Sequence, residues 1–438
     1  PSALILADGK GLDATMPDAD REGYDRIVEN AYQSPVDQPL STFSIDVDKA
    51  SYANARRFLE SGRLPPPDAV RIEEFINYFP YSYPEPTGTH PLSITTELAA
   101  CPWNDALKLA RIGLKGRTVP KSAFPPGNLV FVVDTSGSMA DADKLPLLKQ
   151  AFALLVEELR PEDRVAIVAY AGAAGLILPS TSGRDKAGIL AAVERLQSGG
   201  STAGGAGIQL AYKTAVDNFI KNGNYAYVDG ISEARKVLVE ELGGTLLTLA
   251  KDVKLQVEFN PARVKAYRLV GYENRLLKAA DFNDDAKDAG ELGSGQTVTA
   301  LYEIVPPGVA VPGASVDPLK YQKTAPVSEA AAGPELLTVK FRYKDPAGDK
   351  SKLETAVLAD AEVPWSRASD DFRFAAAAAG FGMLLRRSEF AGGLSYAKVR
   401  ELARPGAEAA PGGSRAELLE LVEKARLLDS PSLRLKER

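Results

Sequence analysis

Residues 128–220 alternate between apolar strands and amphipathic helices, and this pattern limits the fold more than any other feature of the chain. Leu129–Val133 and Val165–Tyr170 are continuously apolar, as expected of parallel strands that are covered on both faces. Each run is followed by apolar residues at helical spacing, and another helix is expected over Ile208–Ile220. Strands that alternate with helices in this way predict a doubly wound α/β sheet.

The sequence on either side of this α/β region has a different hydrophobic pattern. It opens with polar, acidic residues, whereas runs such as Val253–Phe259 later alternate as half-buried strands do, and a helical stretch is expected over Ser232–Ala250. We expect the two flanks of the α/β domain to pack as one unit. The expected segments are a polar leader or tether at 1–40, a mixed α/β segment at 41–127, the α/β domain at 128–250, a β-rich, sandwich-like domain at 251–365 and a helical segment at 366–438.

Composition excludes several kinds of site. The 438 residues include one histidine, His90, and one cysteine, Cys101, so zinc sites built from Cys and His, internal disulfides and most Cys/His catalytic pairs are excluded. The net charge of −6 and the lack of a Lys/Arg run argue against a nucleic acid or an anionic membrane as partner. No apolar run is long enough to span a membrane.

The motif Asp134-Thr-Ser136-Gly-Ser138 directly follows the first buried strand. In an open α/β sheet, ligands bind at the carboxyl ends of the parallel strands. One carboxylate and two hydroxyls at alternate positions supply the hard oxygen ligands that Mg²⁺ or another small divalent cation prefers. The sequence therefore predicts a metal site at this edge of the sheet.

These residues make the chain resemble the von Willebrand factor type A (vWA) domain, whose adhesion site combines Asp-x-Ser-x-Ser with a Thr on a second loop and an Asp on a third. Thr202 matches the second loop. The resemblance extends to a bacterial family in which a vWA domain lies between an N-terminal segment and a C-terminal domain of unknown function. It rests on Phe43–Asp48, Ala69–Glu74, Cys101–Asn104, Tyr170–Gly175 and Phe259–Ala262.

The resemblance implies a protein that binds other proteins and is not an enzyme. The bound ion would be Mg²⁺, or another divalent cation such as Mn²⁺ or Ca²⁺, and an Asp or Glu of an unidentified protein partner would complete its coordination. The family often carries export signals, so a place in the cell envelope is expected, with a lipid anchor conceivable before processing. The alternative is a structural or assembly scaffold with a degenerate, metal-independent vWA domain.

The chain departs from the family pattern near residues 222–225, where about sixty residues that include the third metal loop are absent. Three explanations stay open: a mobile segment is missing from the sequence, a segment has been deleted, or the protein is naturally short. Asp229 ends a strand-like run and could replace the third-loop Asp, although an ordinary turn residue is the simpler interpretation. A short natural form would leave a sheet edge exposed.

Other candidates have simpler structural explanations. Asp46 and Asp48 could bind a cation with Ser51, but a solvent-facing pair or a helix cap is the simpler interpretation. The motif Asp281-x-Asn283-x-Asp285 begins like a calcium loop and lacks its glycine and its final glutamate. A hydrolase that uses Ser136 or Ser138 would need the distant His90 as its base, and we expect His90 to be a surface residue.

Overall fold

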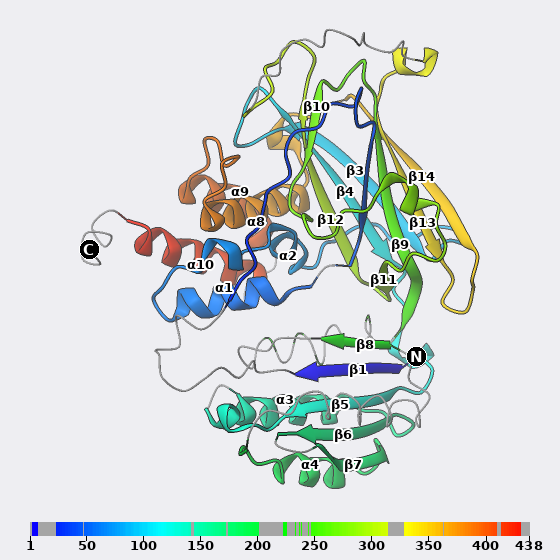
Figure 1. The fold of residues 1–438 in the computed structure, drawn as a ribbon, viewed down its shortest axis with the longest axis vertical. Helices are drawn as coiled ribbons and strands as arrows, with labels where there is room; N and C mark the ends of the chain where they lie inside the picture. The colour runs from blue at the N-terminus through cyan, green and yellow to red at the C-terminus, as the bar shows by residue number, and fades with distance from the viewer. Residues whose placement is uncertain are drawn as a thin grey trace. The chain divides into compact units, whose positions relative to one another are not determined.

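The computed structural model describes residues 2–7, 23–46, 48–141, 144–171, 174–200, 222–225, 247–313, 328–361, 363–409 and 413–430, with the single positions 233, 236, 238 and 244. The backbone contacts divide the chain into two compact units (Figure 1). Unit 1 consists of Pro1–Gly23, Thr118–Thr248 and Gly293–Gln296, and unit 2 of Tyr24–Arg117, Leu249–Leu292 and Thr297–Arg438.

Unit 1 contains the predicted α/β sheet, in the order β7-β6-β5-β1-β8. Strands β8, β1, β5 and β6 are parallel to one another, and the edge strand β7 runs antiparallel to β6. The doubly wound fold class is confirmed. The elements are β1 (Ser2–Ala7), β5 (Asn128–Asp134), α3 (Leu145–Glu158), β6 (Arg164–Tyr170), β7 (Ala174–Ser182), α4 (Lys186–Glu194) and β8 (Asn222–Tyr225).

Strand β5 is buried on both faces, as its unbroken apolar sequence predicts. On one face Phe131 packs edge-on against Phe152 of α3, with their ring centroids 4.8 Å apart. On the other face Val130 and Val132 belong to a second buried cluster that includes Val168 of β6. Burial on both faces fixes the carboxyl end of β5, where the predicted metal motif begins.

Strand β1 comes from the segment expected to be a leader. Its backbone pairs with β5, with Leu4 opposite Val130, and also with β8, so it takes an inner position in the sheet. The prediction of a polar tether is wrong for residues 2–7. The apolar run Ala3–Ala7 is only five residues long, which is too short to show a periodicity, and its pairing partner lies more than a hundred residues away in sequence.

Unit 2 contains the predicted β-sandwich. One sheet has the order β10-β12-β4-β3 and the other the order β11-β9-β13-β14, with β2 paired to β9. Strands β2, β3 and β4 precede the Thr118–Thr248 part of unit 1 in sequence and the other strands follow it, so the sandwich is assembled from both flanks. The strands are β2 (Leu40–Ser44), β3 (Leu92–Ala100), β4 (Lys108–Gly116), β9 (Thr248–Phe259), β10 (Ala266–Leu269), β11 (Gly290–Gly293), β12 (Thr297–Val305), β13 (Glu335–Lys344) and β14 (Ser351–Ala359).

Helices from both ends of unit 2 share a second core (Figure 1). The run Ala375–Ala379 of α8 is fully buried, and small side chains there allow α8 to pack closely against α9 and α2. The helices are α1 (Ala50–Glu60), α2 (Ile72–Asn77), α8 (Asp370–Arg386), α9 (Tyr396–Glu408) and α10 (Ser414–Leu428). The short 3₁₀ helices are η2 (Pro67–Ala69), η3 (Lys121–Ala123), η4 (Gly137–Ala140), η6 (Ala279–Phe282), η7 (Glu329–Ala332) and η8 (Trp365–Arg367).

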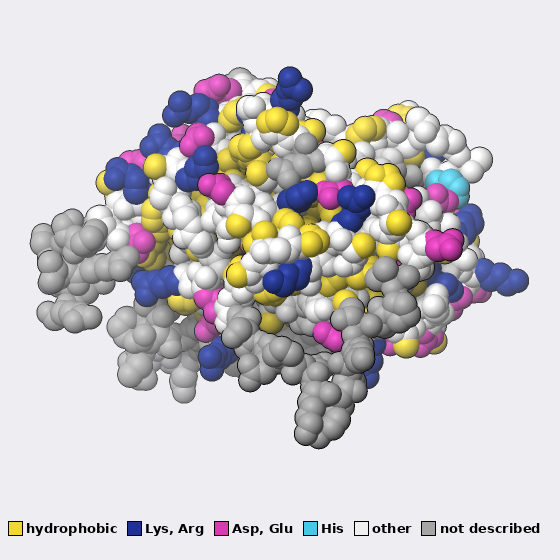
Figure 2. Space-filling view, turned by 90° about the horizontal axis from the view of Figure 1, so that it is seen from above, with side chains coloured by type: hydrophobic (Ala, Val, Ile, Leu, Met, Phe, Trp, Pro, Cys, Tyr) yellow, Lys and Arg dark blue, Asp and Glu magenta, His cyan; other side chains and the backbone are white. Residues whose placement is uncertain are grey.

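One element boundary differs from the sequence prediction. Strand β9 begins at Thr248, so the helix expected over Ser232–Ala250 does not reach its predicted end. No helix in the described ranges is both long and apolar enough to cross a membrane. On the face shown in Figure 2, basic and acidic side chains are interspersed.

Candidate metal site

The carboxyl end of β5 carries the predicted metal-binding motif. Asp134 is the last residue of the strand and is completely buried, and Ser138 lies in the 3₁₀ turn η4 that follows. The backbone N–H of Ser136 donates to Asp134 Oδ1 at 2.7 Å, and the hydroxyl oxygens of Ser136 and Ser138 lie 3.0 Å apart. The structure therefore brings these three predicted side chains together within one turn.

The second carboxylate oxygen of Asp134 has no hydrogen-bond partner among the residues that the structure describes. Oδ2 is buried, whereas Oδ1 accepts from the loop backbone. A buried carboxylate oxygen without a partner costs several kcal/mol unless a proton or a cation compensates it. The neighbouring hydroxyls add two more oxygen ligands, so the residues present fit a small hard cation.

Backbone hydrogen bonds hold the second loop against the first. The N–H of Gly199 donates to Thr135 O at 2.8 Å, and that of Gly137 to Gly200 O at 3.1 Å. Gly200 has a φ of 79°, which a residue with a side chain rarely adopts. The described part of this loop thus ends beside the motif, two residues before Thr202 in sequence.

Two of the predicted ligands lie outside the described residues: Thr202 and Asp229. Strand β8 ends at Tyr225, before Asp229. Within the ranges that the structure describes, no group of three or more His, Cys, Asp or Glu side chains could hold a metal ion. The predicted set contributes one carboxylate from these ranges, Asp134, and otherwise uses hydroxyl groups.

Sequence reasoning missed two charged residues at the edge of this loop. The ammonium group of Lys144 donates to Ser138 O and to Asp141 Oδ2, each at 2.8 Å. This contact holds the pKa of Asp141 below its usual range. The spacing of three residues between an acid and a lysine was a visible signal, but such pairs are common beside helices.

The acidic pair Asp46 and Asp48 has an ordinary role. Both carboxylates bind the guanidinium of Arg275, at 3.1 and 2.9 Å. Ser51 is engaged elsewhere, since its hydroxyl donates to Ala69 O and accepts from the N–H of Arg71. The solvent-facing interpretation of the pair therefore holds.

The calcium-loop mimic also has a structural role. Asp281 accepts from the backbone of Lys278, and the side chains of Asn283 and Asp285 bind Arg342. The oxygens of the mimic therefore accept from protein donors, the backbone of Lys278 and the guanidinium of Arg342.

His90 forms contacts within unit 2. Its Nε2 lies 2.7 Å from Glu354 Oε1 and its Nδ1 lies 3.0 Å from the Tyr343 hydroxyl. The side chain is partly exposed, as expected. Both ring nitrogens of His90 thus contact residues of unit 2, whereas Ser136 belongs to unit 1.

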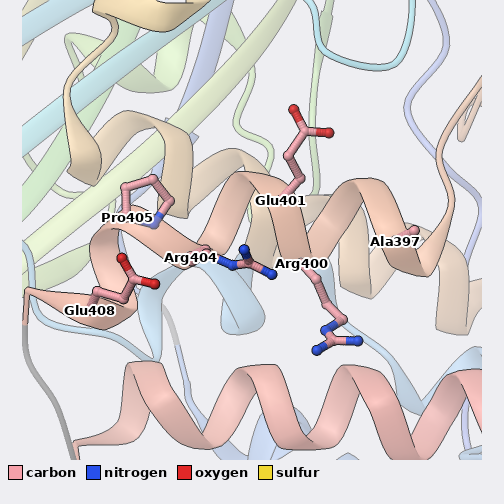
Figure 3. Close-up of a pocket in the computed structure, with 6 residues that line it drawn as sticks. All are labelled: Ala397, Arg400, Glu401, Arg404, Pro405 and Glu408. Carbon is pink, nitrogen blue, oxygen red and sulfur yellow. The ribbon is translucent and has the colours of Figure 1, made fainter.

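A shallow groove runs along one side of α9 (Figure 3). Arg400 points toward α10 and binds Glu423 at 2.8 Å, whereas Glu401 projects away from α10. The lining mixes both signs of charge and contains no pair of groups arranged for catalysis. Its residues are Ala397, Arg400, Glu401, Arg404, Pro405 and Glu408.

Comparisons with known proteins agree with the fold. Three family models match: "von Willebrand factor" over residues 18–111, "von Willebrand factor type A domain" over 129–228, and "Uncharacterized protein YfbK, C-terminal" over 244–428. Among solved structures, a von Willebrand factor type A protein from Catenulispora acidiphila is 14% identical, with a TM-score of 0.36, over 75% of this chain and 90% of that chain.

Two curated relatives are similar in sequence. The uncharacterized protein YfbK of Escherichia coli (strain K12) is 38% identical over 493 residues, which cover 97% of this chain and 84% of the relative. The uncharacterized protein sll0103 of a Synechocystis species is 36% identical over 90 residues, or 20% of this chain and 21% of that protein. The first alignment is longer than the 438-residue chain, so the relative carries residues that this chain lacks.

Proposed function

The chain belongs to the family of the uncharacterized protein YfbK, and we propose that it binds a protein partner through a divalent cation held at the carboxyl end of β5. A von Willebrand factor type A domain fits a role in protein interaction. Beyond that general role, we propose that the interaction depends on a divalent metal and that the ion itself contacts the partner. A carboxylate of the partner would complete the coordination of the ion.

The observation that carries this proposal is the unpartnered, buried Oδ2 of Asp134. Together with the hydroxyls of Ser136 and Ser138, it would hold Mg²⁺, or Mn²⁺ or Ca²⁺ in its place. Thr202 is proposed as a further ligand from the second loop. Asp229 is proposed, as a weaker candidate, to replace the Asp of the third metal loop. The ion supplies a positive charge that attracts a carboxylate, and the protein residues fix where it sits.

The proposal does not include a chemical reaction. The one histidine of the chain is engaged by Glu354 and Tyr343 in unit 2, and Ser136 shares its hydroxyl contact with Ser138. A nucleophilic serine needs a base within hydrogen-bonding reach. Binding is therefore the function that these residues support best. We also propose that the protein acts in the cell envelope.

A second candidate function is a scaffold whose vWA domain no longer needs a metal. The alignment with YfbK favours the scaffold, because YfbK contains residues that this chain lacks. In that case the backbone contacts between the loops at Gly137 and Gly200 would hold the edge of the sheet without an ion. Divalent-metal dependence separates the two candidates.

A pull-down from the native host tests the proposal. The full chain should capture partners with Mg²⁺, lose them with EDTA and regain them when Mg²⁺ is restored in excess. Asp134→Ala should lose the same partners. Asp185→Asn is a matched control in unit 1, because Asp185 caps α4 by accepting from Gly188 and Asn can do the same. If EDTA leaves the captured set unchanged, the scaffold is supported and metal-dependent binding is rejected.

The two ligands outside the described residues can be tested separately. Thr202→Ala and Asp229→Ala should each weaken Mg²⁺ binding, by about 10- to 100-fold for a group that acts through water or through another ligand. Titration calorimetry measures the change. Unchanged affinity in Asp229→Ala would exclude Asp229 as the replacement for the third-loop residue.

A further inference from the structure

A lysine side chain contacts the turn that carries Ser138. Lys144 directly precedes α3, and its ammonium group donates to the carbonyl oxygen of Ser138 and to the carboxylate of Asp141, each at 2.8 Å. Ser138 itself is exposed and lies in a 3₁₀ turn of four residues. So short a turn has few internal hydrogen bonds to keep its shape.

The core of unit 1 fixes the position from which Lys144 reaches this turn. The next residue, Leu145, is buried in the same apolar cluster as Ala151 and Phe152 of α3. The backbone N–H of Leu148 donates to Lys144 O, so Lys144 also begins the hydrogen-bonded helix. The side chain therefore ties the short 3₁₀ turn to helix α3.

The charges around Lys144 argue against a role in metal binding through its charge alone. An ammonium group beside a cation site repels the ion, and Asp141 compensates that charge at 2.8 Å. Both side chains are well exposed, at 39% for Lys144 and 68% for Asp141, so solvent screens the remaining field. The carbonyl contact with Ser138 then carries the effect of Lys144 on the site.

We propose that Lys144 is a positioning residue of the metal loop: it holds the turn so that the Ser138 hydroxyl stays beside that of Ser136. This inference rests on the metal site proposed above. A preorganised ligand loses less conformational freedom when the ion binds, so the lysine should strengthen metal binding although it carries a positive charge.

Amide hydrogen exchange of the full chain without metal tests the structural half of this inference. Lys144→Met should speed exchange of peptides that cover residues 137–140 by about two- to fivefold, the range expected for one exposed contact. Lys149→Met is the matched control, because Lys149 lies in the same helix α3 and donates to Glu194 O at 2.8 Å, away from the loop. It should leave residues 137–140 unchanged. Equal exchange in all three proteins would overturn the proposal.

Mg²⁺ titration of the same variants tests the functional half. Lys144→Met should weaken binding by a similar factor, whereas a role through charge alone would strengthen it. Stronger binding in Lys144→Met would therefore overturn the proposal. If the unaltered chain binds no Mg²⁺ while Lys144→Met still loosens the loop, the metal function fails and the positioning of the turn stands.

Discussion

Single residues show where sequence patterns carry the most information. Asp134, Ser136 and Ser138 could be placed from the sequence because their positions depend only on the end of one buried strand. The roles of Lys144 and Arg275 could not, because each depends on which side chain a loop turns toward it. The same limit applies to the buried glutamates of α2.

The carboxyl of Glu74 should make the stability of unit 2 depend on pH. Burial raises its pKa to about 8, while the backbone N–H of Ser51 opposes the shift by donating to Oε2 at 2.8 Å. A folded-state pKa above the unfolded value of 4.5 contributes stability that is present below pH 4.5 and is lost as the pH rises through 8.

Glu74→Gln should therefore be more stable than the unaltered chain above pH 8, by roughly 2 to 5 kcal/mol, and should flatten the pH dependence. Gln keeps an oxygen that can accept from Ser51. Urea unfolding between pH 5 and pH 9 measures the difference. Glu408→Gln, at an exposed position of α9, is the control. Parallel curves for the unaltered chain and Glu74→Gln would count against this assignment.

Helices and strands can be predicted from the spacing of apolar residues where that pattern extends over enough residues. Strands β5 and β6 and the long helices α3, α8 and α10 lie where the spacing of apolar residues places them. Strand β1 was missed because a five-residue apolar run is also compatible with a loop, and only its pairing with β5 and β8 decides. Sheet partners distant in sequence are set by tertiary packing, which local patterns do not encode.

Helix α8 gives a prediction at this scale. Its run Ala375–Ala379 is fully buried against neighbouring helices, so no room remains for larger side chains. Ala377→Leu should lower the free energy of unfolding by about 1–3 kcal/mol through overpacking. Ala397→Leu, at an exposed position of α9, should change it little. Chemical denaturation measures both variants, and equal stabilities would show that α8 is packed less tightly than described.

At the scale of the whole molecule, the order of elements in sequence hides the architecture. Strands β2, β3 and β4 join β9–β14 in one sandwich, although the Thr118–Thr248 part of the α/β unit lies between them in the chain. The expectation that the flanks pack together agrees with unit 2, whereas the expected tether includes strand β1. The assignment of individual strands to sheets required the structure.

The motif that we propose as a metal site lies within unit 1. The motif, its second loop and the lysine that holds its turn all belong to unit 1, so metal binding should stabilise that unit directly. The central claim is that Asp134 anchors a divalent cation there.

Titration calorimetry of the full chain with Mg²⁺ measures this binding. We expect one ion per chain for the unaltered protein, weaker binding in Ser138→Ala, and no measurable binding in Asp134→Ala, with Asp185→Asn unchanged. Identical isotherms for the unaltered chain and Asp134→Ala, or no binding by the unaltered chain, would contradict it.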